Sequence, residues 1–265
     1  MFEERTPAVV LRSRVHGESD KIVTLLTQNW GKVTGIAKGA KRSRRRFVNV
    51  LEPFTQVNLR FRPSRSEELA FIFGCDLIRS FHRPSRDLQR FALANYVVEL
   101  IDVMVSGRES GAETYELLLN GLIVLEEQDR LSPLFLPVFE LLLLTQVGYA
   151  PHLTGCQQCG LSLAVNDKPL TFSSSLGGLL CQNCRGQGGS SLLISPETLR
   201  LLHGLKIAEV DTCLRIMASP RVHRETRTLV SSWLSHHLSR PLKSQAFLEQ
   251  SGLFGDSQID GSPEE

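Results

Sequence analysis

The amino-acid sequence predicts an α+β protein in which a small five-stranded β-barrel precedes an α-helical domain that carries a four-cysteine metal finger. Three observations favour this class. Five short segments rich in β-branched and aromatic residues occupy positions 1–80, apolar residues then recur at helical spacing, and two Cys-x2-Cys pairs interrupt the helical part. The chain has 265 residues, of which 42% are hydrophobic and 22% charged, so it is long enough to bury a sizeable core.

The predicted strands are short and are separated by turn-like stretches such as HGESD, NWG and RPSRSE. They cover residues 9–15, 21–28, 32–39, 54–62 and 68–77. Between the third and fourth strands, Phe47, Val50 and Leu51 recur at helical spacing, and Pro53 ends the element. A five-stranded barrel with a short helix at this point is the OB-fold plan, and OB-folds commonly bind single-stranded nucleic acid.

Beyond the fifth strand the apolar period is that of α-helices. The spacing predicts helices over residues 91–105, 115–125 and 135–147. The third is expected to kink or restart at Pro137. Ser195-Pro196 and Ser219-Pro220 each predict an N-cap followed by proline at the first helical position.

Charge is concentrated in the first part of the chain. The formal net charge is only +2, but positions 1–80 hold 15 Lys and Arg against 8 Asp and Glu, whereas the remainder holds 15 against 20. A local basic domain on a nearly neutral chain indicates a polyanionic partner. The predicted domains are the barrel over 1–80, the helical domain over 81–250 with a finger at about 152–186, and a disordered tail over 251–265.

The stretch KGAKRSRRRF, which begins at Lys38, holds the densest positive charge. Its basic side chains, called the basic run below, are Lys38, Lys41, Arg42, Arg44, Arg45 and Arg46. Phosphate binding is the favoured interpretation, and a solvated charged loop and a nuclear localisation signal are the alternatives. Trp30, in the NWG turn, is expected to be exposed and is a candidate for stacking on bases.

Four cysteines predict a metal site. Cys156 and Cys159, then Cys181 and Cys184, form two Cys-x2-Cys knuckles separated by 21 residues, which is close to the spacing of a zinc ribbon. A redox dithiol or disulfides are less favoured, since the chain has neither a thioredoxin-like unit nor a secretory signal. Four thiolates leave no position for water, so the expected zinc ion is structural. Cys75 and Cys213 lie outside the pattern and are expected to be buried.

Enzyme classes find no support in the sequence. It contains no G-x4-G-K-[S/T] phosphate loop, no H-E-x-x-H motif and no H-x-E paired with P-C-x-x-C. We therefore expect no catalytic residue. No apolar run is long enough to span a membrane, and neither a signal nor a transit peptide is visible, so a cytoplasmic location is expected. The alternative function is a zinc-ribbon and OB-fold adaptor that acts on RNA or in transcription.

Three quoted stretches resemble the bacterial DNA repair protein RecO family. They are FELLLLTQVGYAPHLTGCQQCG from Phe139, FSSSLGGLLCQNC from Phe172, and KGAKRSRRRF leading into LEPF. The resemblance extends from the first strand to about Leu238. It implies an OB-fold, a helical domain, a four-cysteine zinc finger with one Zn²⁺, and no enzymatic activity.

The resemblance also implies a role in DNA repair and homologous recombination. Proteins of this family bind single- and double-stranded DNA, anneal complementary strands, and bind the C-terminal tail of single-strand-binding protein. With RecR they load recombinase onto coated DNA in the RecF pathway. Zinc ligation carries over to Cys156, Cys159, Cys181 and Cys184. DNA contact maps onto a patch formed by the basic run with Arg60 and Arg62.

Overall fold

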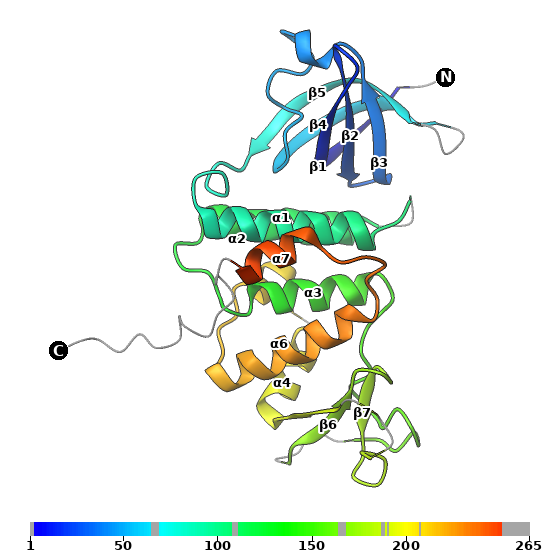
Figure 1. Ribbon diagram of the computed structural model, residues 1–265, viewed down its shortest axis with the longest axis vertical. Helices are drawn as coiled ribbons and strands as arrows, with labels where there is room; N and C mark the ends of the chain where they lie inside the picture. The colour runs from blue at the N-terminus through cyan, green and yellow to red at the C-terminus, as the bar shows by residue number, and fades with distance from the viewer. Residues whose placement is uncertain are drawn as a thin grey trace, which may run out of the picture. The chain divides into compact units, whose positions relative to one another are not determined.

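A computed structural model describes residues 3–64, 69–107, 111–163, 168–186, 189, 191–206 and 208–250 (Figure 1). The tail expected to be disordered, 251–265, lies outside the described residues. By contact the chain divides into two compact units, Met1–Glu127 and Gln128–Glu265. No helix in the described segments is long and apolar enough to cross a membrane.

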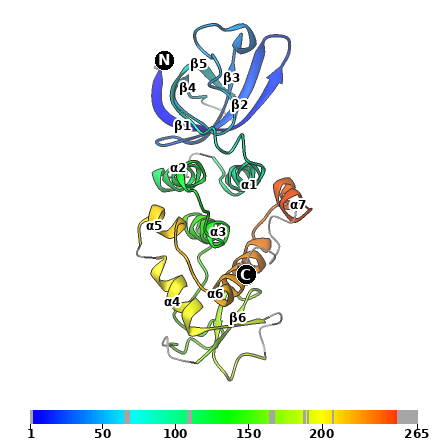
Figure 2. The same cartoon turned by 90° about the vertical axis from the view of Figure 1, so that its left-hand side faces the viewer.

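The first unit begins with a closed five-stranded barrel, as predicted (Figures 1 and 2). Its strands are β1 (Glu4–His16), β2 (Asp20–Thr27), β3 (Gly31–Ala37), β4 (Thr55–Arg62) and β5 (Ala70–Ser80). They follow one another around the barrel in the order β1-β2-β3-β5-β4, and β4 closes it by pairing with β1. Only the β3–β5 pair among these is parallel. This is the OB-fold arrangement.

The barrel core follows the period of two that strands impose on their side chains. On β4, Val57, Leu59 and Phe61 are fully buried, while the residues between them face outward. On β5, Ala70 and Ile72 are buried and their neighbours are partly exposed. One face of each strand therefore fills the interior, and the other is available for contacts outside the barrel.

The helix predicted over Phe47–Leu51 is wrong. Residues 44–49 form consecutive bends, and the helical turn of this connection is instead a short 3-10 helix, η1 (Ala40–Arg42), inside the basic run. Asn49 has φ of 53°, a left-handed conformation that a right-handed helix does not accept. Phe47, Val50 and Leu51 nevertheless pack into the barrel core, so their apolar spacing reflects burial without a helix.

Two helices complete the first unit. Helix α1 (Leu88–Met104) contacts β1, and α2 (Ala112–Glu127) contacts β1 and β2. Lys32 Nζ donates to the carbonyl of Asp102 at 2.6 Å, and Gln56 Nε2 donates to Tyr115 Oη at 2.9 Å. Both helices are thus fastened to the barrel strands by polar contacts as well as by apolar packing.

The second unit is mainly helical and includes a small sheet. Its elements are α3 (Phe135–Gln146), β6 (Leu170–Ser173), β7 (Gly178–Leu180), β8 (Ser191–Ile194), α4 (Pro196–Gly204), α5 (Val210–Leu214), α6 (Pro220–Ser235) and α7 (Lys243–Gln250). The predicted caps are confirmed: the hydroxyls of Ser195 and Ser219 accept from backbone amides in the first turns of α4 and α6. Pro137 lies in the first turn of α3, where a missing N–H is tolerated without a restart.

A partly buried carboxylate joins α4 to α6. Glu225 Oε2 accepts hydrogen bonds from Ser195 N at 2.7 Å, Ser195 Oγ at 2.7 Å and Thr198 Oγ1 at 2.6 Å. Its Oε1 accepts from Arg221 Nε at 2.8 Å. Burial by itself raises the pKa of Glu225, but the hydrogen bonds from Thr198, Ser195 and Arg221 outweigh it and lower the pKa to about 2.

Glu225→Gln is expected to lower the free energy of unfolding of the second unit by about 3 kcal/mol at pH 7, since one pKa unit corresponds to about 1.4 kcal/mol. Folding depresses this pKa from 4.5 to about 2, so the stabilisation is present above pH 4.5 and is lost as the pH falls toward 2. Chemical denaturation at pH 7 and pH 3 measures the difference, which should shrink at pH 3. Glu249→Gln, at an exposed position on α7, is the control. A pH-independent difference would contradict the assignment.

Candidate metal centre and nucleic-acid interface

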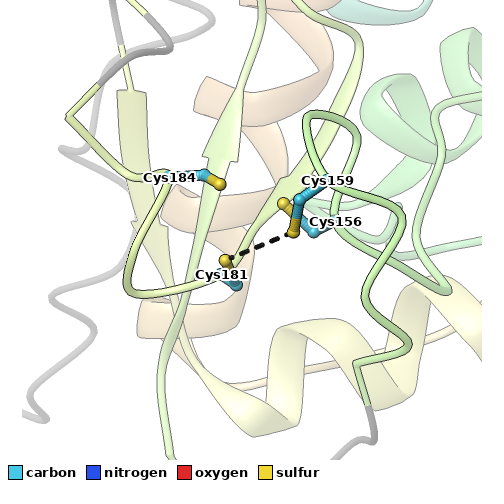
Figure 3. A group of neighbouring side chains, drawn as sticks. All are labelled: Cys156, Cys159, Cys181 and Cys184. Atoms are coloured by element: carbon cyan, nitrogen blue, oxygen red, sulfur yellow. Dashed lines mark hydrogen bonds between the residues drawn. The ribbon is translucent and has the colours of Figure 1, made fainter.

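The four predicted cysteines converge at one point of the second unit (Figure 3). Their Sγ atoms all lie within 4.8 Å of one another, and the Cys159 and Cys181 sulfurs are 3.8 Å apart. Cys156, Cys181 and Cys184 are buried, and Cys159 is exposed. The sequence spacing therefore identified a real cluster. Cys75 and Cys213 lie outside it and are buried, as expected.

Tight turns of the backbone present the sulfurs. Gly160 N donates to Cys156 O at 2.9 Å, and Gly160 has φ of 74°, which only glycine adopts at little cost. The second knuckle follows β7 directly, and Cys184 N donates to Cys181 O at 3.0 Å. A three-stranded sheet in the order β7-β6-β8 supports this knuckle. Both pairs are thus held by local hydrogen bonds.

The thiols differ in acidity. Burial raises the pKa of Cys156, but the backbone amides of Cys181, Cys159 and Gln158 lower it to about 6. A hydrogen bond with Cys181 and then burial raise the pKa of Cys184 to about 12. Four thiols this close do not all ionise unless a cation offsets their charge.

The donor set fits a tetrahedral soft metal ion. A tetrahedron with bonds of about 2.3 Å has edges of about 3.8 Å, so the four sulfurs stand near the separations that such an ion requires. Four sulfur ligands from paired knuckles are typical of structural zinc, and they leave no position for a reacting water. His152 is exposed and is not part of the cluster.

The two knuckles and the sheet β7-β6-β8, together called the cysteine module below, contact the helices of the second unit. The turn between β6 and β7 contains Gly177, with φ of 72°, and the Trp233 ring of α6 lies against it so closely that a Cβ would meet Trp233 Cη2 at 2.4 Å. Trp233 Nε1 donates to the carbonyl of Tyr149 at 2.9 Å. His203 on α4 also hydrogen-bonds to the Leu153 carbonyl at 3.0 Å. Disruption of the cysteine cluster should therefore also destabilise α4 and α6.

In the first unit, the basic run is a loop anchored at several points. Asp20 Oδ1 accepts from Gly39 N at 2.8 Å, and Lys41 N donates to Ser19 O at 3.0 Å, so the loop lies against the β1–β2 turn. The hydrogen bonds from the Gly39 amide and, second, from the Ser19 hydroxyl lower the pKa of Asp20. Further on, Cys75 N donates to Arg46 O at 3.2 Å. The backbone of the run is positioned by the barrel.

The charged ends of the basic run are left to solvent. All six side chains are exposed, and within the described part of the chain no carboxylate lies at ion-pair distance from any of them. Arg46 is the most constrained: its guanidinium donates to Lys38 O at 3.0 Å and lies over the Phe47 ring at 5.1 Å. An uncompensated, exposed cationic loop is suited to a polyanion.

The two predicted neighbours, Arg60 and Arg62, both face outward from β4 but differ in their partners. Arg60 lies 3.6 Å from Glu3 and 4.0 Å from Asp76, so its charge is shared with two carboxylates. Arg62 lies over Phe71 and Phe73, with its guanidinium carbon 5.6 and 5.9 Å from the ring centroids. Arg14, exposed on β1, was not predicted. Its place on the outer face depends on strand register, which sequence alone does not reveal.

The exposure predicted for Trp30 is wrong. Its indole is half-buried and packs edge-on against Phe61, with centroids 5.8 Å apart and planes at 90°. Trp30 thereby covers one end of the barrel core. The NWG turn itself is present between β2 and β3.

Comparisons with known proteins agree over both units. Residues 1–81 match the family model for the N terminus of recombination protein O, and residues 85–246 match the model for its C terminus. DNA repair protein RecO of Syntrophus aciditrophicus is 37% identical over 249 residues, which cover 93% of this chain and 95% of that protein. The protein of the same name from Geobacter metallireducens is 38% identical over 250 residues, with 94% and 98% covered. The chain therefore belongs to the RecO family.

Proposed function

We propose that this chain is a non-enzymatic mediator of homologous recombination in DNA repair. It binds single- and double-stranded DNA, anneals complementary strands, and helps to load recombinase onto DNA coated by single-strand-binding protein in the RecF pathway. The observation that carries the proposal is the exposed basic run, without acidic partners among the described residues, on an OB-fold barrel of a RecO-family chain. The proposed DNA contacts are Lys38, Lys41, Arg42, Arg44, Arg45, Arg46, Arg60 and Arg62.

The mechanism requires no catalytic residue. Cationic side chains neutralise phosphates and release counterions, which lowers the repulsion between two DNA strands held on the same surface. Complementary bases then search for register while the strands stay close. Because Gly39 and Lys41 are hydrogen-bonded to the β1–β2 turn, the loop presents its charges from a fixed backbone rather than from a free chain.

The proposed domains divide this work. The barrel over 1–80 holds DNA, and the helical domain over 81–250 holds one Zn²⁺ through Cys156, Cys159, Cys181 and Cys184. The ion would fix the two knuckles to each other and would take no part in a reaction. RecR and the C-terminal tail of single-strand-binding protein are the proposed protein partners, and the cytoplasm, where bacterial DNA lies, is the proposed location.

Binding to three matched oligonucleotides tests the proposal. Fluorescence anisotropy with single-stranded DNA, duplex DNA and single-stranded RNA of one sequence should show salt-sensitive binding to both DNA forms. A clear preference for RNA, which a protein achieves by reading the 2′-hydroxyl, would instead favour an RNA-associated adaptor. Absence of DNA binding at low salt would contradict the proposal outright.

A further inference from the structure

The outer face of β5 carries two phenylalanines that the barrel core does not use. Phe71 and Phe73 alternate with the core residues Ala70 and Ile72, so they project outward and are partly exposed. Their ring centroids are 5.0 Å apart, with planes at 62°. Exposed aromatic pairs on a barrel strand are costly to leave in water, and they commonly mark a binding surface.

Strand register places Phe71 in a row of side chains that runs across the barrel wall. Neighbouring strands pair Arg14 with Ile22, Ile22 with Ile36, Ile36 with Phe71, and Phe71 with Arg62. Because Val23 on β2 and Ala70 and Ile72 on β5 point into the core, the five residues of the row lie on the outer face. Ile22 is buried there, whereas the other four are partly or fully exposed. The row is therefore apolar and aromatic in its middle and cationic at both ends.

Arg62 completes the aromatic surface. Its guanidinium lies over both rings, and no carboxylate of the described residues is within ion-pair distance of it. Arg60, two positions earlier, has such partners in Glu3 and Asp76. Arg62 thus keeps its full charge for a phosphate while its plane and the two rings offer stacking faces. Single-stranded nucleic acids are held by this combination of cation and π-surface.

We propose that Phe71, Phe73 and Arg62 form a stacking site for an unpaired DNA base. The proposal rests on the proposed function, since it assumes that the barrel binds DNA. The bases of a duplex are stacked on each other and offer no free face, so this site favours single strands, whereas the basic run contacts phosphates of either form. An apolar side chain of a protein partner is the competing occupant. The cationic ends of the row favour a polyanion instead.

The test pairs a ring-removing variant with a base-free ligand. The Phe71→Leu/Phe73→Leu double variant keeps apolar bulk but removes both π-faces. A thymine oligonucleotide and an abasic oligonucleotide of equal length are each titrated over a range of salt. The wild type should prefer the thymine strand by about tenfold. The double variant should lose that preference and keep the salt slope, because its cationic side chains are unchanged.

Two further variants serve as controls. Phe71→Tyr/Phe73→Tyr keeps both rings and should keep the preference. Phe91→Leu, at an exposed phenylalanine on α1, should behave as the wild type. Thermal unfolding checks that each variant is folded.

Three results would overturn the stacking site. They are a preference that persists in the leucine variant, an equal loss of affinity for both strands, and unchanged DNA binding with loss of a protein partner. Failure of the proposed function has a different signature. In that case the wild type shows no salt-dependent DNA binding at all, whatever residues occupy positions 71 and 73.

Discussion

Protein purified without chelator is expected to contain one zinc ion per chain, and its removal should unfold the cysteine module while the barrel stays folded. The cluster holds four convergent sulfurs, and few apolar residues surround them: Leu163 and Leu176 pack against the cysteines and Leu180. So small a core does not stabilise a fold by itself. Metal binding supplies about 10–16 kcal/mol in zinc-finger peptides, so most of the module's stability should depend on it.

Metal analysis and hydrogen exchange measure the two parts of this prediction. Cys181→Ser should abolish stoichiometric zinc and remove protection from β6, β7 and the Gly177 turn, with smaller losses in α4 and α6. Protection of β1–β5 should be unchanged. Cys213→Ser, which alters a buried thiol of the same unit outside the cluster, should retain the metal. Full zinc content in Cys181→Ser, or equal loss of protection in the barrel, would contradict the structural role.

Neutralising Arg44, Arg45 and Arg46 together is expected to halve the salt dependence of single-strand binding. If all six side chains of the basic run contact phosphate, the log-log slope is about 4, at about 0.7 per contact. Removing three contacts should bring it to about 2 and weaken binding most at low salt. The arginines are exposed and lack acidic partners, so the variant should fold normally.

The control for this triple variant must change net charge equally. Replacing Arg200, Lys206 and Arg224 by alanine does so at exposed positions of the second unit. Its slope should equal that of the wild type. A slope left intact by the Arg44/Arg45/Arg46 change would place the DNA surface away from the basic run.

The sequence predicted best those features that residues close together in the chain determine. Each Cys-x2-Cys pair is one turn, so the two pairs predicted the cysteine cluster. Serine before proline predicted the starts of α4 and α6. The five strands were also predictable, since turn residues separate them. Elements whose formation depends on tertiary contacts were not predicted from the sequence. These are the short helices α5 and α7 and the small sheet β7-β6-β8 beside the cysteines.

The direction in which side chains point was what the sequence predicted least well. AFIFGC on β5 is apolar at nearly every position, so its period of two is hidden, and only the packed barrel shows that Phe71 and Phe73 face outward. Trp30 sits in the expected turn, but its indole folds back over Phe61. Phe47, Val50 and Leu51 had the spacing of a helix, yet Asn49 takes a left-handed conformation and the segment bends instead. Tertiary packing decided each case.

Annealing of complementary oligonucleotides, each coated beforehand with the cognate single-strand-binding protein, tests the central claim most directly. Strand pairing is followed by fluorescence with and without this chain, and bare strands run in parallel. We predict that the chain accelerates pairing of the coated strands, which requires both a DNA surface and a productive encounter with the coating protein. Acceleration confined to bare strands would contradict a mediator and leave a general cationic annealer, and no acceleration on either would contradict both.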